Sequence, residues 1–173
     1  VVDVMREYER FSPTALNAYV GPRTSSYLTH LSTQLRESGI HADLRIMQSN
    51  GGVATVESCC ERPVNILMSG PAGGVMGGHY FASLDGERNI ITVDIGGTSA
   101  DISTLVDGQI KIMNPRDSYV SGHPVLVPMI DLITIGAGGG SVAFIDAAGG
   151  FQVGPRSAGS NPGPACYHRG GVV

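Results

Sequence analysis

One stretch of the sequence combines carboxylates, glycines and hydroxyls in the pattern of a phosphate-binding loop: Asp94-Ile95-Gly96-Gly97-Thr98-Ser99-Ala100-Asp101. The paired glycines carry no Cβ, so backbone N–H groups can converge on an anion there. Thr98 and Ser99 add hydroxyl donors at the same place. The carboxylates of Asp94 and Asp101 suit hydrated Mg²⁺, which binds one or two carboxylates together with phosphate oxygens. The alternative is a plain hairpin turn, since the same residue types form turns.

Three further glycine-rich runs carry possible chemistry. The run 69–78 lies between a predicted strand and a predicted helix, so its amides suit an anion; a tightly packed small-residue helix is the alternative. A loop at Gly136, Gly138, Gly139 and Gly140 is predicted to lie near nucleotide or substrate, or to be a simple turn. A strand over 142–146 follows it, whereas a dinucleotide-binding loop needs a helix. The run 154–167 is too irregular to predict a regular element.

The cysteines and histidines lack the spacing of a metal site. Cys59, Cys60 and Cys166 form no C-x-x-C pair. For Cys166 a buried apolar role is favoured over a nucleophilic one. A lone histidine such as His123 is more often structural than catalytic.

Local patterns predict the elements that position these residues. Ser12-Pro13 indicates a helix start and Gly21-Pro22 its end, with a second helix over about 24–38. Alternating segments around Asn50-Gly51-Gly52 predict a β-hairpin. Residues 63–68 favour a short strand, from which a glycine loop leads into a helix ending near Leu84.

The rest of the chain is predicted to consist of short strands joined by tight turns. Of the 25 glycines, 21 follow residue 69, and they are interleaved with β-type runs. Residues 90–94, 101–106 and 109–113 predict a three-stranded meander, and 125–130 a further strand. The fold class is therefore α/β with antiparallel hairpins.

Composition excludes several classes of function. The net charge is −4, and only 11 residues are Lys or Arg, which disfavours nucleic-acid binding. No apolar run reaches about 18 residues, so no membrane span is expected. The few cysteines indicate no disulfide framework and favour a cytoplasmic location.

The motifs follow one another in an order that resembles the hydantoinase A / 5-oxoprolinase family, which includes related subunits of acetone carboxylases. The resemblance covers most of the chain, and chance is not a credible explanation of it. The matching stretches are 8–10 with 17–19, 47–52, 69–74, 94–101, 135–141, and 154–159 with 162–167.

The resemblance implies an actin-like ATPase fold of the acetate/sugar kinase and heat-shock chaperone type, with ribonuclease-H-like domains, a mixed sheet, β-hairpins and flanking helices. The octet resembles the phosphate loop of the second domain. The family's first D-x-G-G-T loop has no counterpart here, so an internal fragment is expected. It would be a single fragment, residues 1–173, with helices and a hairpin over about 1–60 and a glycine-rich second nucleotide-binding half over 61–173.

The resemblance also implies a reaction, in which ATP phosphorylates the carbonyl oxygen of a cyclic amide such as hydantoin or 5-oxoproline and a hydrolase opens the ring. Asp94 would bind Mg²⁺, or another divalent metal, and act in catalysis with Asp101. The implied partners are ATP, a small cyclic amide, the remainder of the chain and a B-type subunit. The implied cofactor-binding residues are Gly96, Gly97, Thr98, Ser99, Gly136, Gly138, Gly139 and Gly140.

Three alternatives stay open. The chain can be part of an ATP-dependent ketone carboxylase subunit. It can also be a non-enzymatic ATPase or sensor module of the actin type. A Rossmann-type dinucleotide-binding module is the third, because the run 70–78 precedes Asp94 by the interval that this layout requires. That last alternative fails if the octet is a hairpin turn.

Overall fold

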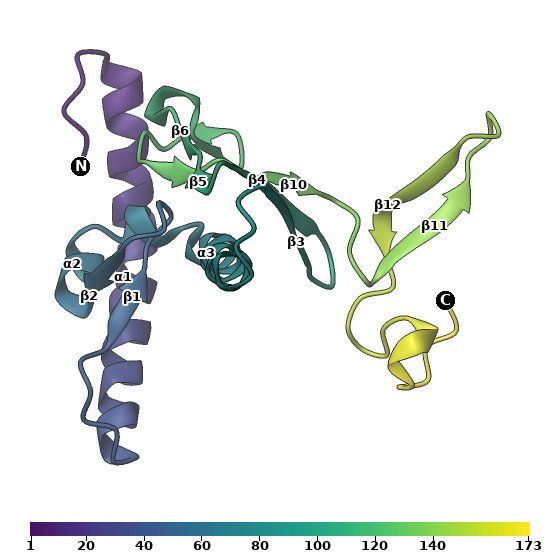
Figure 1. The fold of residues 1–173 in the computed structure, drawn as a ribbon, viewed down its shortest axis with the longest axis horizontal. Coiled ribbons are helices and arrows are strands. Elements are labelled where there is room, and N and C mark those ends of the chain that lie inside the picture. The colour runs from purple at the N-terminus through teal and green to yellow at the C-terminus, as the bar shows by residue number, and fades with distance from the viewer.

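The structure, a computed structural model, describes residues 1–173 and is elongated (Figure 1). A long helix lies at one side, small sheets and a second long helix lie in the middle, and a β-hairpin extends at the other side. None of the helices is both long enough and apolar enough to cross a membrane.

The elements in chain order are α1 (Glu7–Glu37), β1 (Arg45–Met47), β2 (Val53–Thr55), α2 (Val56–Glu61), η1 (Pro63–Ile66), α3 (Ser69–Leu84), β3 (Ile90–Ile95), β4 (Ala100–Val106), β5 (Gln109–Ile110), β6 (Ile112–Met113), η2 (Pro115–Asp117), β7 (Tyr119–Val120), β8 (His123–Pro124), β9 (Met129–Ile130), β10 (Ile133–Ile135), β11 (Ser141–Ile145), β12 (Phe151–Ser157) and η3 (Ala165–Tyr167).

Helix α1 is continuous, so the predicted helix start at Ser12-Pro13 and helix end at Gly21-Pro22 are wrong. An interior proline removes a helical hydrogen bond and costs about 3 kcal/mol, and tertiary contacts offset this here. The Ser12 hydroxyl donates to the Pro124 carbonyl at 2.8 Å. The Asn17 amide bridges to the segment after α2, accepting from the Val64 N–H at 3.2 Å.

The β1–β2 hairpin is confirmed, with Met47 opposite Val53. The predicted strand over 63–68 is wrong, because these residues form the short helix η1 and the turn into α3. The predicted glycine loop after it is also wrong: α3 begins at Ser69 and contains those glycines, although its end at Leu84 agrees with the prediction.

The central sheet contains the predicted meander of β3, β4 and β5, joined by β10. The third strand, expected over 109–113, ends at Ile110, and β6 pairs with β9 in a separate sheet. β3 pairs with β4 along its whole length, from Ile90 opposite Leu105 to Ile95 opposite Ala100. β5 and β10 both pair with β4, at different parts of that strand. All strand pairs of the molecule are antiparallel, so the expected mixed sheet is not found.

Helix α3 packs on one face of this sheet at two of its glycines. A Cβ on Gly78 would lie 2.6 Å from Thr92 Cγ2, and one on Gly74 would lie 3.4 Å from Asp94 Oδ2. Only glycine permits the helix to come so close to β3. Four buried residues pack together where α3 crosses the sheet, and they form a small core: Ala72, Val75, Leu105 and Ile130.

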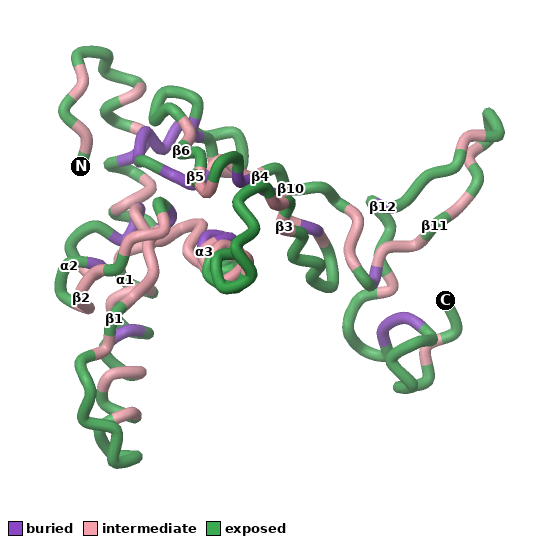
Figure 2. Tube along the Cα trace, viewed as in Figure 1, coloured by how far each residue is buried: buried purple, intermediate pink, exposed green.

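The opposite face of the sheet is apolar and open to solvent. Six aliphatic side chains of β3, β4 and β10 are between 41% and 71% exposed there: Ile91, Val93, Ile95, Val106, Ile133 and Ile135. The accessible surface of the whole chain is 11243 Å², whereas about 8,000 Å² is expected for a compact monomer of this mass. Figure 2 shows buried segments near α1, α3 and β4, and a further one close to the C-terminus.

A second small core lies beside α1 and is formed by Val64, Val125, Val127 and Met129. The predicted strand over 125–130 is therefore mostly wrong, because only Met129 and Ile130 form a strand. Val125, Leu126 and Val127 are buried in irregular backbone, with Leu126 at φ +53°. The β-type composition of this run reflects burial in a core rather than strand pairing.

The last part of the chain forms the β11–β12 hairpin and the short helix η3 (Figure 1). The predicted strand over 142–146 is confirmed by β11. The run from Gly154 was expected to be irregular, yet its first four residues end β12, because Ser157 pairs with Ser141 across the hairpin.

Candidate functional site

The octet forms a β-turn-β unit, as predicted. Asp94 is the penultimate residue of β3, and Asp101 is the second residue of β4. The turn between the strands is closed by a 2.9 Å hydrogen bond from the Gly96 N–H to the Ser99 carbonyl. The Rossmann alternative is therefore wrong. That layout needs a helix after a glycine loop, and here the loop connects two antiparallel strands while the preceding glycines lie inside α3.

The turn presents unused hydrogen-bond donors. The backbone N–H groups of Gly97, Thr98 and Ser99 donate to no group within the chain. The Thr98 and Ser99 hydroxyls likewise have no partner in the chain, and Gly97 and Thr98 are exposed. Consecutive free amides in a glycine turn form the kind of concavity that binds anions.

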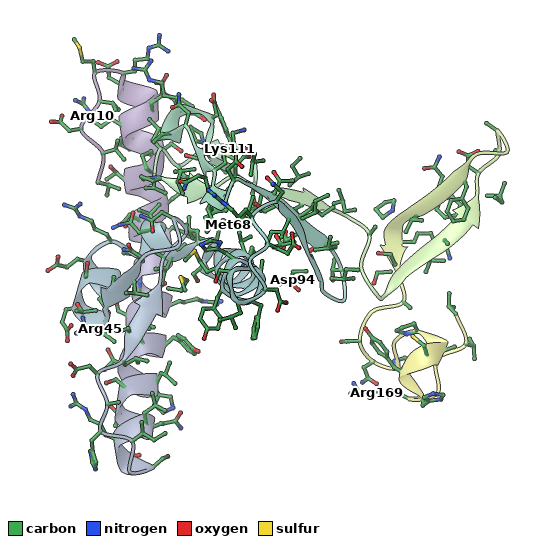
Figure 3. All side chains as sticks on the ribbon, in the orientation of Figure 1. Arg10, Arg45, Met68, Asp94, Lys111 and Arg169 are labelled. Atoms are coloured by element: carbon green, nitrogen blue, oxygen red, sulfur yellow. The ribbon has the colours of Figure 1, made fainter.

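The two acidic residues lie on one face of the sheet. Asp94 and Asp101 are directly opposite each other on β3 and β4. Asp94 is exposed and lies beside α3 (Figure 3), where a groove of about 390 Å³ runs between that helix and the sheet. Asp101 is half-buried, and its Oδ1 accepts a 2.5 Å hydrogen bond from the Thr134 hydroxyl on β10.

The second glycine loop lies directly on the octet turn. The N–H of Gly139 donates to the Gly96 carbonyl at 2.9 Å, and the N–H of Gly140 donates to the Gly97 carbonyl at 2.7 Å. A Cβ on Gly138 would lie 2.6 Å from the backbone of Thr98, so only glycine fits there. The Gly138 N–H donates to the Ser141 hydroxyl oxygen at 2.9 Å, so the amides of Gly138, Gly139 and Gly140 are all engaged within the protein.

Some residues of this cluster were missed by sequence reasoning. Thr134 is placed beside Asp101 by the pairing of β10 with β4, and the alternation of Ile133, Thr134 and Ile135 is a strand signal that could have indicated it. Tyr167 also reaches the two glycine loops. Its segment is part of the family-matching stretch 162–167, but no local pattern indicates this contact.

Other residues with reactive side chains lie apart from the octet. Cys166 is exposed, contrary to the burial expected of it, whereas Cys59 is buried. Burial raises the pKa of the Cys59 thiol, which disfavours its reactive thiolate form. No three His, Cys, Asp or Glu side chains are grouped as a metal site requires. A cation beside Asp94 and Asp101 would therefore take further ligands from a bound phosphate and water.

The fold and this cluster define a class: a mixed α/β protein with small antiparallel sheets, in which two glycine loops meet at a hairpin turn flanked by carboxylates. The sequence profile described as Hydantoinase/oxoprolinase matches residues 10–173. The chain belongs to the hydantoinase/oxoprolinase family.

Individual relatives agree with this assignment. Caprolactamase subunit alpha of Pseudomonas jessenii is 45% identical over 168 residues, which cover 97% of this chain and 24% of that protein. 5-Oxoprolinase 1 of Arabidopsis thaliana is 32% identical over 171 residues, which cover 98% of this chain and 13% of that protein. The chain therefore spans a quarter or less of the length of these relatives.

Solved structures share the fold. The ATP-dependent caprolactamase from Pseudomonas jessenii superposes with a TM-score of 0.78 at 44% identity, over 97% of this chain and 24% of that chain. Nucleotide-free acetone carboxylase, from work on ATP-dependent acetone carboxylation, gives a TM-score of 0.74 at 31% identity, over 90% of this chain and 22% of that chain.

Proposed function

We propose that this chain provides one phosphate-binding half of the ATP site in an enzyme that opens cyclic amides. The observation that carries the proposal is the octet turn, where three consecutive amides and two hydroxyls are free. The fold proposed for the whole protein is of the actin-like ATPase type, with residues 61–173 forming its second nucleotide-binding half. The similarity to ATP-dependent enzymes of the family supports this assignment.

In this proposal Gly96, Gly97, Thr98 and Ser99 bind the phosphates of ATP. Donors already oriented toward a developing negative charge need no rearrangement during reaction, which is the main source of electrostatic catalysis. The loop at Gly136, Gly138, Gly139 and Gly140 supports this turn and lies beside the nucleotide. With the amides of Gly138–Gly140 engaged, Gly136 retains an amide without a partner in the chain.

The residues around the turn fit a Mg²⁺ ion. Asp94 offers an exposed carboxylate without a hydrogen-bond partner, and Asp101 lies directly opposite it. Mg²⁺ uses one or two carboxylates and completes its coordination with phosphate oxygens and water. When bound, the ion would neutralise phosphate charge. Asp94 would hold it, and Asp101, oriented by Thr134, would support it.

The proposed reaction makes an amide susceptible to water. The carbonyl oxygen of the cyclic amide attacks the γ-phosphorus of ATP, the bond from that phosphorus to the bridging oxygen breaks, and ADP leaves. Water then adds to the carbon that bears the phosphorylated oxygen, and the ring C–N bond breaks, so that the nitrogen takes up a proton and an acyl phosphate remains. A second water attacks the acyl carbon and breaks its bond to the phosphorylated oxygen, which releases the ring-opened carboxylate and inorganic phosphate. Most of the protein's contribution is positioning and charge stabilisation.

The proposed partners are the remainder of the polypeptide, which would supply the other half of the ATP site, and a B-type subunit. Caprolactamase subunit alpha is itself one subunit of an enzyme. The three cysteines are free, which agrees with the proposed cytoplasmic location.

An isotope experiment tests the proposed reaction. The complete protein with its partner subunit is incubated with Mg²⁺, ATP and 5-oxoproline, hydantoin or caprolactam carrying ¹⁸O in the amide carbonyl. Phosphorylation of that oxygen predicts ¹⁸O in the inorganic phosphate. If the ring opens while all ¹⁸O stays in the organic product, the proposed activation is wrong.

The second candidate function is an ATP-dependent ketone carboxylase subunit, which the superposition on acetone carboxylase supports. The amide reaction is preferred because identity to the caprolactamase structure is 44% against 31%. Consumption of ATP with acetone and bicarbonate, but with no cyclic amide, would establish the carboxylase instead.

A further inference from the structure

The side chain of Tyr167 reaches the place where the two glycine loops meet. A Cβ on Gly139 would lie 3.6 Å from the Tyr167 hydroxyl oxygen, and a Cβ on Gly97 would lie 3.9 Å from it. Tyr167 belongs to η3, far along the chain from both loops. A hydroxyl from a third segment is thus added to the donors of the octet turn.

The local backbone fixes the Tyr167 ring. Gly163 has φ +78°, and a Cβ there would lie 2.7 Å from Tyr167 Cδ2, so the ring packs directly on this glycine. The Tyr167 N–H donates to the Pro164 carbonyl at 3.0 Å, and the Ala165 N–H donates to the Val173 carbonyl at 2.7 Å. A ring held in this way presents its hydroxyl with little rotational freedom.

The carbonyl groups beside the hydroxyl are already used. Those of Gly96 and Gly97 accept hydrogen bonds from the N–H groups of Gly139 and Gly140. The Tyr167 hydroxyl itself makes no hydrogen bond in the chain and is part of an exposed residue, 39% accessible. A phenol hydroxyl is a donor, and a phosphate oxygen is the acceptor that the neighbouring free amides also favour.

We propose that Tyr167 is a nucleotide-binding residue whose hydroxyl donates a hydrogen bond to a phosphate oxygen of ATP bound at the octet turn. This proposal rests on the proposed function of that turn. Hydrogen bonds to ionised acceptors are stronger than neutral ones. Removing the hydroxyl is therefore expected to lower kcat/KM for ATP by about 10- to 100-fold.

The test compares Tyr167→Phe with Tyr27→Phe in the complete enzyme. The phenylalanine keeps the ring that packs on Gly163, so the fold is retained, and thermal unfolding checks this. Tyr27 lies on α1 and is 64% exposed, which makes its variant a matched control. We expect the Tyr167 variant alone to lose kcat/KM for ATP, with the KM for the cyclic amide unchanged.

The Asp94→Asn enzyme, measured in parallel, separates the two proposals. If Asp94→Asn loses turnover and Tyr167→Phe stays within twofold of the native kcat/KM for ATP, the role of Tyr167 is wrong and the proposed function stands. If both variants behave as the native enzyme, both proposals are wrong. Equal rises in KM for ATP and for the amide would also overturn the role of Tyr167, because a direct phosphate contact affects ATP alone.

Discussion

Asp94 and Asp101 occupy directly opposed positions on β3 and β4, so two carboxylates share one face of the sheet at the base of the octet turn. Like charges placed opposite each other across a strand pair are destabilising. A bound cation would relieve that repulsion. This geometry supports the proposed role of Asp94 as a metal ligand over a role in the turn alone.

Asp94→Asn is expected to lower ATP turnover in the complete protein by about 10²–10³. Asparagine keeps the size of the side chain and removes its charge, so the melting temperature should not fall. Steady-state ATP hydrolysis and thermal unfolding are measured on the same variant, with Asp3→Asn near the N-terminus as control. Normal turnover with an unchanged melting curve would leave Asp94 as a turn residue.

Gly138→Ala is expected to destabilise the protein by about 1–3 kcal/mol, because the new Cβ must displace the backbone of Thr98. The matched control for stability is Gly136→Ala, where a Cβ would meet nothing within 4 Å. Thermal unfolding of the two variants gives the comparison. Equal melting temperatures would show that the two loops do not pack as closely as described.

Alanine substitutions at two adjacent glycines of α3 should have opposite effects on the free energy of unfolding. Gly77→Ala enters open space and should stabilise the protein by about 1 kcal/mol through helix propensity. Gly78→Ala places a Cβ 2.6 Å from Thr92 Cγ2, and the β-branched threonine has little freedom to move away. We expect Gly78→Ala to be the less stable variant by at least about 1 kcal/mol in denaturant unfolding. The reverse order would contradict the packing of α3 on β3.

The 173-residue chain alone is expected to bind ATP weakly or not at all. In the proposed enzyme a second domain supplies part of the contacts, and the remainder has to overcome an association cost of at least about 4 kcal/mol. Titration calorimetry with Mg²⁺ and ATP measures this directly. Micromolar affinity would mean that the octet turn is a complete site.

The β11–β12 hairpin should loosen at acidic pH. Hydrogen bonds from the Gly150 N–H, the Gln152 side chain and the Ala148 N–H lower the pKa of Asp146. The stabilisation is therefore complete above the unfolded value of about 3.9 and is lost as pH falls through the lower folded pKa. An NMR titration should show the Gly150 and Ala148 amide signals moving in that range, and Asp146→Asn should abolish the change.

The octet could be predicted from sequence because the information is local. Two strand-type runs around paired glycines determine a hairpin whatever surrounds it. The order of the motifs along the chain is also read directly from the sequence, and it indicated the family. The close contact between the two glycine loops depends on the pairing of β10 with β4, which joins residues 33 positions apart, Thr134 and Asp101. No local pattern contains that pairing.

The helical errors have the same origin. Pro13 and Pro22 are local signals for helix boundaries, and contacts of α1 with distant segments override both. The glycines of α3 were predicted to form an anion-binding loop, with a tightly packed small-residue helix as the alternative. The alternative is correct, because Gly74 and Gly78 lie inside α3 and allow its close approach to β3. Composition alone cannot distinguish a glycine that bends the chain from one that makes room for a neighbour.

The exposed aliphatic face of β3, β4 and β10 determines the tendency of this polypeptide to associate in solution. A net charge of −4 gives molecules weak mutual repulsion, which salt screens within about 10 Å. The exposed aliphatic face, by contrast, can bind other apolar surfaces at any salt concentration. Such surfaces include a hydrophobic fluorescent dye, a column resin, a chaperone or a second copy of the chain. Association of the purified chain should therefore rise with protein concentration, fall with added detergent and persist at high salt.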